Sequence, residues 1–285
     1  MIEIPDLGSI TDVADWVELR ISVSSNSLSK AAVASAIENV AGEEPSEGFI
    51  IGVWRELERR QRLYSRPLFR VEDRLIEPEI DHQPPNEYLA CLLLSLYGGQ
   101  GGAHRPAKLF ERLTSEAIST YLSGQAVVFG WPSNPDDSPD EEEESRIKRK
   151  VRRVAEALRE RFCEAPPARF KDRDLDVVGW IPFADRRSSQ VVILMQSTVQ
   201  QNWKDKLPVP LDAWRQYVHW GCCPVKAFAI PRIVTDHEWH EASVDKGVLF
   251  DRARIVNLLS DGVQDMAFRQ ELSAWVEQRL TDLED

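Results

Sequence analysis

Residues 175–198 read LDVVGWIPFADRRSSQVVILMQST, two apolar segments separated by a short polar turn. Residues 175–183 and 190–198 are rich in apolar and β-branched side chains, and residues 184–189 have turn composition, so we predict a β-hairpin. The second segment is apolar almost without interruption. Such a run is typical of a strand that lies in the centre of a sheet, with both faces covered.

The segments on either side of this hairpin extend it to a larger sheet. Upstream, residues 106–122 have the apolar periodicity of an amphipathic helix, and residues 126–130 favour a short strand. Downstream, residues 211–220 favour a helix and residues 225–230 another buried strand. The order of helix, strand, inserted helix, hairpin, helix and strand predicts an α/β domain with a central mixed sheet flanked by helices.

The first hundred residues have a different pattern and are predicted to be mainly helical. Residues 11–19 and 29–40 each place apolar side chains on one helical face. The glycine-rich run at 97–102 is the clearest joint in the chain. We therefore expect a helical N-terminal region, 1–100, and an α/β domain, 101–285.

Composition excludes several classes of protein. The chain has 285 residues, of which 42% are hydrophobic and 29% charged, so it can bury a sizeable core and is not disordered as a whole. Its apolar runs are too short to span a bilayer, and its start lacks the pattern of a secretory signal. The four cysteines form no CxxC pair, and residues 236–240 (DHEWH) do not match the HExxH zinc motif, so we expect a loop there. These features predict a soluble, cytoplasmic protein with no membrane partner.

Charge is distributed unevenly along a chain whose net charge is −12. An acidic linker, 132–144, precedes a basic helix predicted at 145–162. The candidates for contact with nucleic-acid phosphates are Lys148, Arg149, Arg152 and Arg153. Two alternatives stay open: a solvated helix neutralised by its acidic neighbour, and a basic face that the acidic run covers.

Several oxygen-bearing side chains are predicted to converge at one edge of the sheet. Asp174 and Asp176 open the first strand of the hairpin, and Gln196 closes the second. Because the start of one hairpin strand lies beside the end of its partner, we expect Asp176 and Gln196 to meet. Carboxylate and amide oxygens are the ligands that Mg²⁺ prefers. A lysine nearby, Lys206 or Lys204, would position a water molecule or neutralise developing charge.

Each of these residues also has a structural interpretation. The structural interpretation of Asp174 is a turn residue. For Glu111, on the helix at 106–122, it is a surface or capping acid. Gln196 is compatible with a buried amide that is hydrogen-bonded. Asp176 begins an apolar strand, where an acid is unfavourable unless it is paired or liganded, so its metal-binding interpretation is favoured.

Residues 174–183, 185–186, 190–196 and 202–206, with Leu109-Phe110-Glu111 upstream, resemble the core of the PD-(D/E)XK restriction-endonuclease-like superfamily. The resemblance is to a Mrr-like branch that has Gln at the usual acid position. It implies an endonuclease, dependent on Mg²⁺ or Mn²⁺, that hydrolyses double-stranded DNA in bacterial restriction or anti-phage defence, beside other defence proteins. The implied metal ligands are Glu111, Asp174, Asp176 and Gln196, and the implied catalytic residues are Asp176, Gln196, Lys206 and Lys204.

One position departs from the pattern of that superfamily. The pattern places Lys two residues after Gln196, where this chain has Thr198. Either a lysine from the neighbouring element, Lys206 or Lys204, takes over the role, or the domain is catalytically inactive. In the second case the chain is expected to act as a nuclease-like scaffold or regulator in a multi-protein defence complex.

Overall fold

The computed structural model describes residues 9–79, 83–98, 104–129, 143–167 and 173–283. Contacts between Cα atoms divide the chain into two units. Unit 1 comprises Met1–Gly102, Pro231–Ile233 and Asp251–Asp285, and unit 2 comprises Ala103–Ile230 and Val234–Phe250. None of the described helices has both the length and the apolar character that a membrane span requires.

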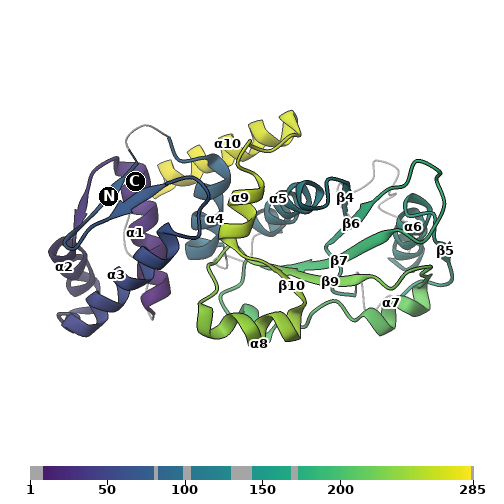
Figure 1. Cartoon of the computed structure of the whole chain (residues 1–285), viewed down its shortest axis with the longest axis horizontal. Helices are drawn as coiled ribbons and strands as arrows, with labels where there is room; N and C mark the ends of the chain where they lie inside the picture. The colour runs from purple at the N-terminus through teal and green to yellow at the C-terminus, as the bar shows by residue number, and fades with distance from the viewer. Residues whose placement is uncertain (1–8, 80–82, 99–103, 130–142, 168–172, 284–285) are drawn as a thin grey trace. The chain divides into compact units, whose positions relative to one another are not determined.

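Unit 2 is built on a mixed sheet of five described strands in the order β10-β9-β7-β6-β4 (Figure 1). The strands are β4 (Gln125–Val128), β6 (Val177–Ile181), β7 (Val191–Ser197), β9 (Val225–Ala229) and β10 (Val248–Phe250). Strands β4, β6 and β7 are antiparallel, whereas β9 and β10 continue the sheet in parallel with β7. The predicted hairpin is confirmed, because Val177 pairs with Met195 and Ile181 with Val191.

Helices cover both faces of this sheet. The helices of unit 2 are α5 (His104–Leu122), α6 (Glu143–Ala157), α7 (Leu211–Tyr217) and α8 (Asp236–Lys246). On one face, Gly179 permits close packing of α5, since a Cβ atom there would lie 2.6 Å from Ile118 Cγ2. On the other face, Val178 and Leu194 share a core with side chains of α6 and α7. Figure 1 shows α5 on one side of the strands and α7 and α8 on the other.

The structure corrects two local expectations in unit 2. The basic helix expected at 145–162 ends at Ala157, and the left-handed backbone of Arg159 (φ 58°) leads into strand β5 (Arg161–Phe162), which pairs with β8 (Val218–His219). Residues 236–240, expected as a loop, are the first residues of α8. A signal for this helix is present in the sequence. Thr235 and Glu238 have capping-box spacing, and the Thr235 hydroxyl donates to the Glu238 carboxylate at 2.8 Å.

Unit 1 combines helices with a small sheet. Its helices are α1 (Ile10–Ser24), α2 (Lys30–Ala41), α3 (Glu47–Gln61), α4 (Asn86–Tyr97), α9 (Arg252–Leu258) and α10 (Met266–Asp282). The described strands β1 (Leu28–Ser29), β3 (Leu75–Pro78) and β2 (Phe69–Val71) form an antiparallel sheet in that order. Unit 1 therefore consists mainly of helices but also contains this small sheet.

The C-terminal helices belong to unit 1, although the sequence places residues 101–285 in one domain. Both α9 and α10 pack against α4, which is buried along nearly its whole length. A helix such as α4, apolar on all sides, needs neighbours around it. Which distant segments supply those neighbours is not visible in local periodicity.

Candidate functional site

Asp176 lies where β6 begins, and the ladder is irregular there. The backbone N–H of Asp176 donates to Met195 O at 3.0 Å. Met195 is also the register partner of Val177, so two residues of one strand oppose a single residue of the other. This is the arrangement of a β-bulge, which bends a strand and turns a side chain in a new direction.

The Asp176 carboxylate is turned toward Ser197 on the neighbouring strand. Its Oδ2 accepts hydrogen bonds from the Ser197 backbone N–H at 2.7 Å and from Ser197 Oγ at 3.3 Å. These bonds explain how an acid is accommodated at the start of an apolar strand. The hairpin thus brings Asp176 beside the end of β7 as predicted, but the carboxylate contacts Ser197.

Gln196 is buried, with 7% of its surface exposed, and its side-chain oxygen has no hydrogen-bond partner among the described residues. Strand alternation places its side chain on the same face as Leu194, and in the parallel pair it lies beside Phe228. A buried carbonyl oxygen left unsatisfied costs about 1–3 kcal/mol, so such an atom calls for an explanation. A metal ion or a water molecule at Oε1 would remove this penalty.

Glu111 and Asp174 are held in other surroundings. Glu111 is buried on α5, where Lys108 Nζ donates to its carboxylate at 2.7 Å. Asp174 follows Arg173 in a turn before β6, and both residues have left-handed backbone (φ 53° for Arg173 and 58° for Asp174). Asp174 therefore lies in a turn, whereas Glu111 is a buried acid paired with Lys108 and neither a surface nor a capping acid.

The structure does not bring the three expected carboxylates together as a metal site. In the described ranges, no three side chains of the His, Cys, Asp or Glu type form a group that could hold a metal ion. The metal-binding roles expected of Glu111, Asp174 and Asp176 stay predictions. Helix α5 packs on the face opposite to that of Gln196, and Asp174 lies in the turn before β6. Asp176 and Gln196 both lie at the end of the sheet where β6 begins and β7 ends.

The lysines expected to assist catalysis follow β7: Lys204 lies in a short 3-10 helix, Trp203–Asp205, and Lys206 comes directly after it. Lys204 Nζ forms an ion pair with the Glu238 carboxylate of α8. Lys206 is half-buried, and its ammonium group has no ion pair or hydrogen bond within the described part of the chain. Thr198, at the position of the superfamily lysine, is buried, and its Oγ1 accepts a hydrogen bond from the Gln200 backbone N–H at 3.2 Å.

Sequence reasoning missed Lys246, which holds this segment in place. Its side chain is buried, and Nζ donates to the backbone oxygens of Lys204 (3.0 Å) and Lys206. The same Nζ lies 5.5 Å from the ring centroid of Phe228. The position of Lys246 before Gly247, at the end of a helix, carries no signal of burial, so only the structure identifies this role.

The basic helix α6 has one apolar and one basic face. Ile147 and Val151 are buried in the core of unit 2, whereas Lys148, Arg152 and Arg153 are exposed. Arg149 is half-buried. The Arg152 guanidinium lies 5.2 Å from the ring centroid of Phe162. The exposed face is therefore basic.

Residues 132–142 of the acidic linker, and the side chains of its last two residues, lie outside the described part of the structure.

Sequence reasoning also missed a buried ionic cluster in unit 1. Arg60 Nη1 donates to Asp15 Oδ1 at 2.6 Å and to Glu18 Oε1 at 2.7 Å. Arg252 Nη2 donates to the same two oxygens at 2.9 Å and 3.1 Å, and Tyr88 OH donates to Glu18 Oε2 at 2.6 Å. The two carboxylates and two guanidinium groups balance in charge, although Arg252 Nη1 is buried without a hydrogen-bond partner among the described residues. Their arrangement indicates a structural role.

Comparison with known proteins adds little to this description. No family model matches the chain. No curated protein matches it. Among solved structures, the chain is similar to restriction endonuclease FokI, with a TM-score of 0.20 and 10% identity over 93% of this chain and 47% of that one. The chain thus spans about half the length of the FokI chain, and at this TM-score the likeness carries no argument about fold or function.

Proposed function

We propose that unit 2 hydrolyses phosphodiester bonds of double-stranded DNA with the help of Mg²⁺ or Mn²⁺. One observation carries this proposal. The side-chain oxygen of Gln196 is buried without a partner among the described residues, at the end of the strand that also fixes the Asp176 carboxylate. An unsatisfied oxygen at the strand end that also fixes an acid suits a hard divalent cation, which binds oxygen ligands. The resemblance to restriction-endonuclease-like proteins supports the same chemistry.

In this proposal each residue has a separate task. Asp176 and Gln196 contribute the oxygen ligands, and the hydrogen bonds from Ser197 hold the carboxylate in position. A bound cation would polarise the scissile phosphate and lower the pKa of a water molecule. Lys206, whose ammonium group is not engaged by the described residues, orients the attacking water. The exposed bases of α6 bind the DNA backbone.

A plasmid-cleavage assay tests this function. We expect the full chain to nick or linearise supercoiled DNA in Mg²⁺ or Mn²⁺ and to be inactive in a chelator. Asp176→Asn and Lys206→Met should each lower the rate at least about a hundredfold, the usual effect of losing a positioned catalytic group. Asp212→Asn is the matched control, because this exposed aspartate forms a surface ion pair with Arg215 of α7. Cleavage that persists unchanged in Asp176→Asn would refute the proposal.

The biological setting implied by the resemblance, restriction or anti-phage defence, belongs to the same proposal. Its test is the plating efficiency of phages on bacteria that express the chain with its neighbouring gene products. Protection that is lost in Asp176→Asn and kept in Asp212→Asn supports a nuclease at the centre of the system.

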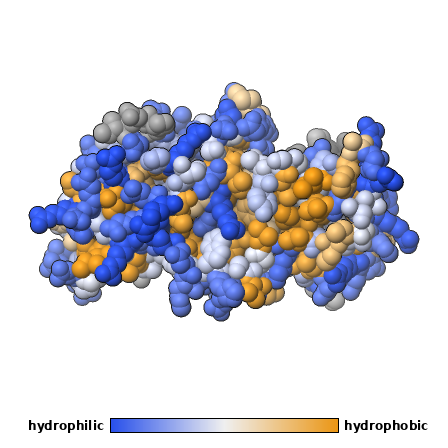
Figure 2. Space-filling model, viewed as in Figure 1, coloured by the Kyte–Doolittle hydropathy of each residue, from blue (hydrophilic) through white to orange (hydrophobic). Residues whose placement is uncertain are grey.

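A second candidate, a catalytically inactive nuclease-like scaffold, also has observations in its favour. Thr198 replaces the expected lysine, and the described residues hold no three-carboxylate metal site. Exposed apolar side chains of the hairpin offer a surface for a protein partner. Ile181 pairs with Val191 across the hairpin, and the side chain of Phe183, two residues after Ile181, is 59% exposed. Figure 2 shows that hydrophobic areas do reach the surface on the visible face of the molecule.

The two candidates differ in what a surface substitution does. If the chain is a scaffold, Ile181→Asp with Val191→Asp should abolish phage protection, and Asp176→Asn should have no effect. If it is a nuclease, Asp176→Asn alone should abolish both cleavage and protection.

A further inference from the structure

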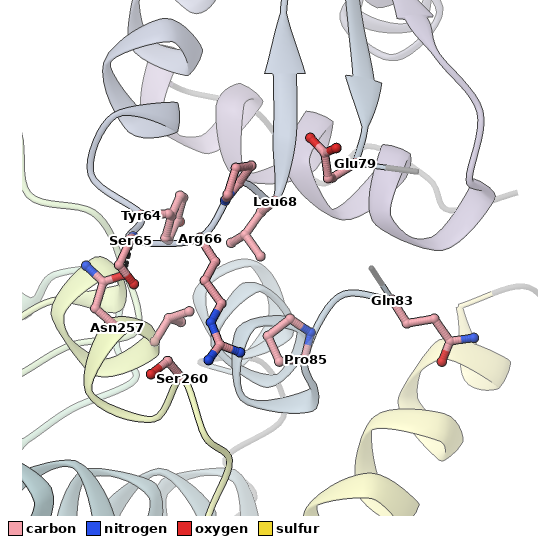
Figure 3. A pocket seen from close by; sticks show the side chains of 11 residues that line it. Tyr64, Ser65, Arg66, Leu68, Glu79, Gln83, Pro85, Asn257 and Ser260 are labelled. Carbon is pink, nitrogen blue, oxygen red and sulfur yellow. Dashed lines mark hydrogen bonds between the residues drawn. The ribbon is translucent and has the colours of Figure 1, made fainter. Parts of the chain in front are cut away.

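A cavity of about 430 Å³ lies within unit 1 and has no part in the proposed nuclease function (Figure 3). It is lined by residues 64–68, by Glu79, Gln83 and Pro85, and by residues of α9 and the turn after it. Sites for small organic molecules have volumes of about 300–1,000 Å³, so the cavity is large enough for a ligand. In Figure 3 the Arg66 side chain extends into the space between Pro85 and Ser260.

The walls of the cavity are fixed by hydrogen bonds. Asn257 of α9 accepts from the Ser65 backbone N–H and donates to Leu63 O, both at 2.8 Å. The Tyr64 hydroxyl donates to Glu18 at 3.1 Å and accepts from Arg252 Nε at 3.0 Å. The segment that carries Arg66 is thereby attached both to α9 and to the buried ionic cluster. A cavity with such walls is formed before a ligand arrives, which lowers the cost of binding.

The lining has the chemistry of a site for an amphipathic molecule. Pro67, Leu68, Pro85 and Val256 supply apolar surface. Arg66 supplies a guanidinium group, whose ion pair with Asp261 (3.1 Å) joins two side chains that are 63% and 85% exposed. A surface ion pair of this kind contributes little, so a ligand acid can replace Asp261 at small cost.

Glu79 limits where negative charge can lie. Figure 3 shows Glu79 near Leu68 and away from Ser260, so Arg66 and Glu79 mark different parts of the cavity. A ligand with acids at both ends would meet the Glu79 carboxylate, whereas a ligand with one acid would not. We propose that this cavity binds a small organic anion, with an apolar body toward Leu68 and one carboxylate, sulfonate or phosphate group on Arg66.

Two dyes of the same shape test this proposal on the full chain. The anionic probe is 1-anilinonaphthalene-8-sulfonate, and the neutral probe is N-phenyl-1-naphthylamine, which lacks the sulfonate group. Fluorescence titration should give one saturable site for the anionic dye. Arg66→Gln should weaken that dye about tenfold or more and leave the neutral dye unchanged, because only the charged hydrogen bonds are lost.

Matched variants separate this site from general dye binding. Arg62→Gln removes a neighbouring exposed guanidinium that does not line the cavity and should change neither titration. Ser260→Trp narrows the cavity and should weaken both dyes, and near-UV circular dichroism verifies that each variant is folded. If the anionic dye does not saturate, or binds Arg66→Gln and Arg62→Gln equally, the proposal is wrong. Retention of both dyes in folded Ser260→Trp would also overturn it.

Discussion

Arg252 and Asp15, which are 237 positions apart in the chain, form a fully buried ion pair at 2.9 Å in unit 1. This contact ties the first residue of α9 to α1. Burial alone would raise the pKa of the Asp15 carboxyl group, but the charges of Arg252 and Arg60 outweigh it and hold that pKa well below its ordinary value. Asp15 is therefore ionised in the folded protein.

Loss of either charge is expected to destabilise unit 1. Arg252→Met should lower the free energy of unfolding by about 3–5 kcal/mol, because it leaves two carboxylates with too few partners in the interior. Urea unfolding followed by far-UV circular dichroism measures this change. Arg62→Met, at an exposed position, serves as the control and should stay within about 0.5 kcal/mol of the wild type. Equal stabilities of the two variants would contradict the structural role of the cluster.

The lowered pKa of Asp15 predicts a dependence of stability on pH. Its unfolded pKa is about 3.9, so the stabilising contribution is fully present above that value and is lost as the pH falls toward the folded pKa. The free energy of unfolding should therefore decrease between about pH 5 and pH 3. In Asp15→Asn this part of the decrease should be absent. If the free energy of unfolding depends on pH in the same way in the wild type and in Asp15→Asn, the decrease at low pH does not come from Asp15.

Sequence reasoning predicted the sheet of unit 2 because its signals are local. The hairpin follows from two apolar runs around a polar turn, and α5 from the periodicity of residues 106–122. The placement of α9 and α10 in unit 1 rests on packing against α4, to which no local pattern points. The cluster of Asp15, Arg60 and Arg252 joins three distant helices, and each of these residues taken alone resembles a surface charge.

The four thiols are expected to differ in reactivity. Cys91 is fully buried on α4, and burial raises the pKa of its thiol to about 12. Cys163, Cys222 and Cys223 are exposed. Because the thiolate is the reactive form, a disulfide reagent should modify these three cysteines in the native protein and Cys91 only after unfolding. Mass spectrometry counts the modified thiols, and Cys91→Ala is the control. If the number of thiols modified in the native protein is lower in Cys91→Ala than in the wild type, Cys91 is reactive in the folded state and the prediction is contradicted.

DNA binding through α6 predicts a particular dependence on salt. Each phosphate contact contributes about −0.9 to the slope of log K against log salt concentration. Lys148→Gln with Arg152→Gln should therefore reduce the magnitude of that slope by about 2. Arg70→Gln with Arg74→Gln changes the net charge equally, at exposed positions of unit 1, and should leave the slope unchanged. Equal slopes for both double variants would exclude a DNA contact through α6.

The candidate site was only partly predictable for a geometric reason. Sequence spacing places Asp176 beside the end of β7, and the structure agrees. The bulge at Asp176, which turns its carboxylate toward Ser197, depends on a ladder irregularity that spacing does not encode. Glu111 was expected at the site from the resemblance, yet α5 packs on the face opposite to that of Gln196. The burial of Lys246 likewise depends on tertiary packing.

Binding of Mn²⁺, followed by electron paramagnetic resonance of the free ion, tests the central claim most directly. We predict one Mn²⁺ site in the wild type and in Asp212→Asn. Affinity should fall at least about tenfold in Asp176→Asn and in Gln196→Leu, because each variant removes one oxygen ligand and little volume. Equal affinity of the four proteins, or no binding by the wild type, would contradict a divalent-cation site at this end of the sheet.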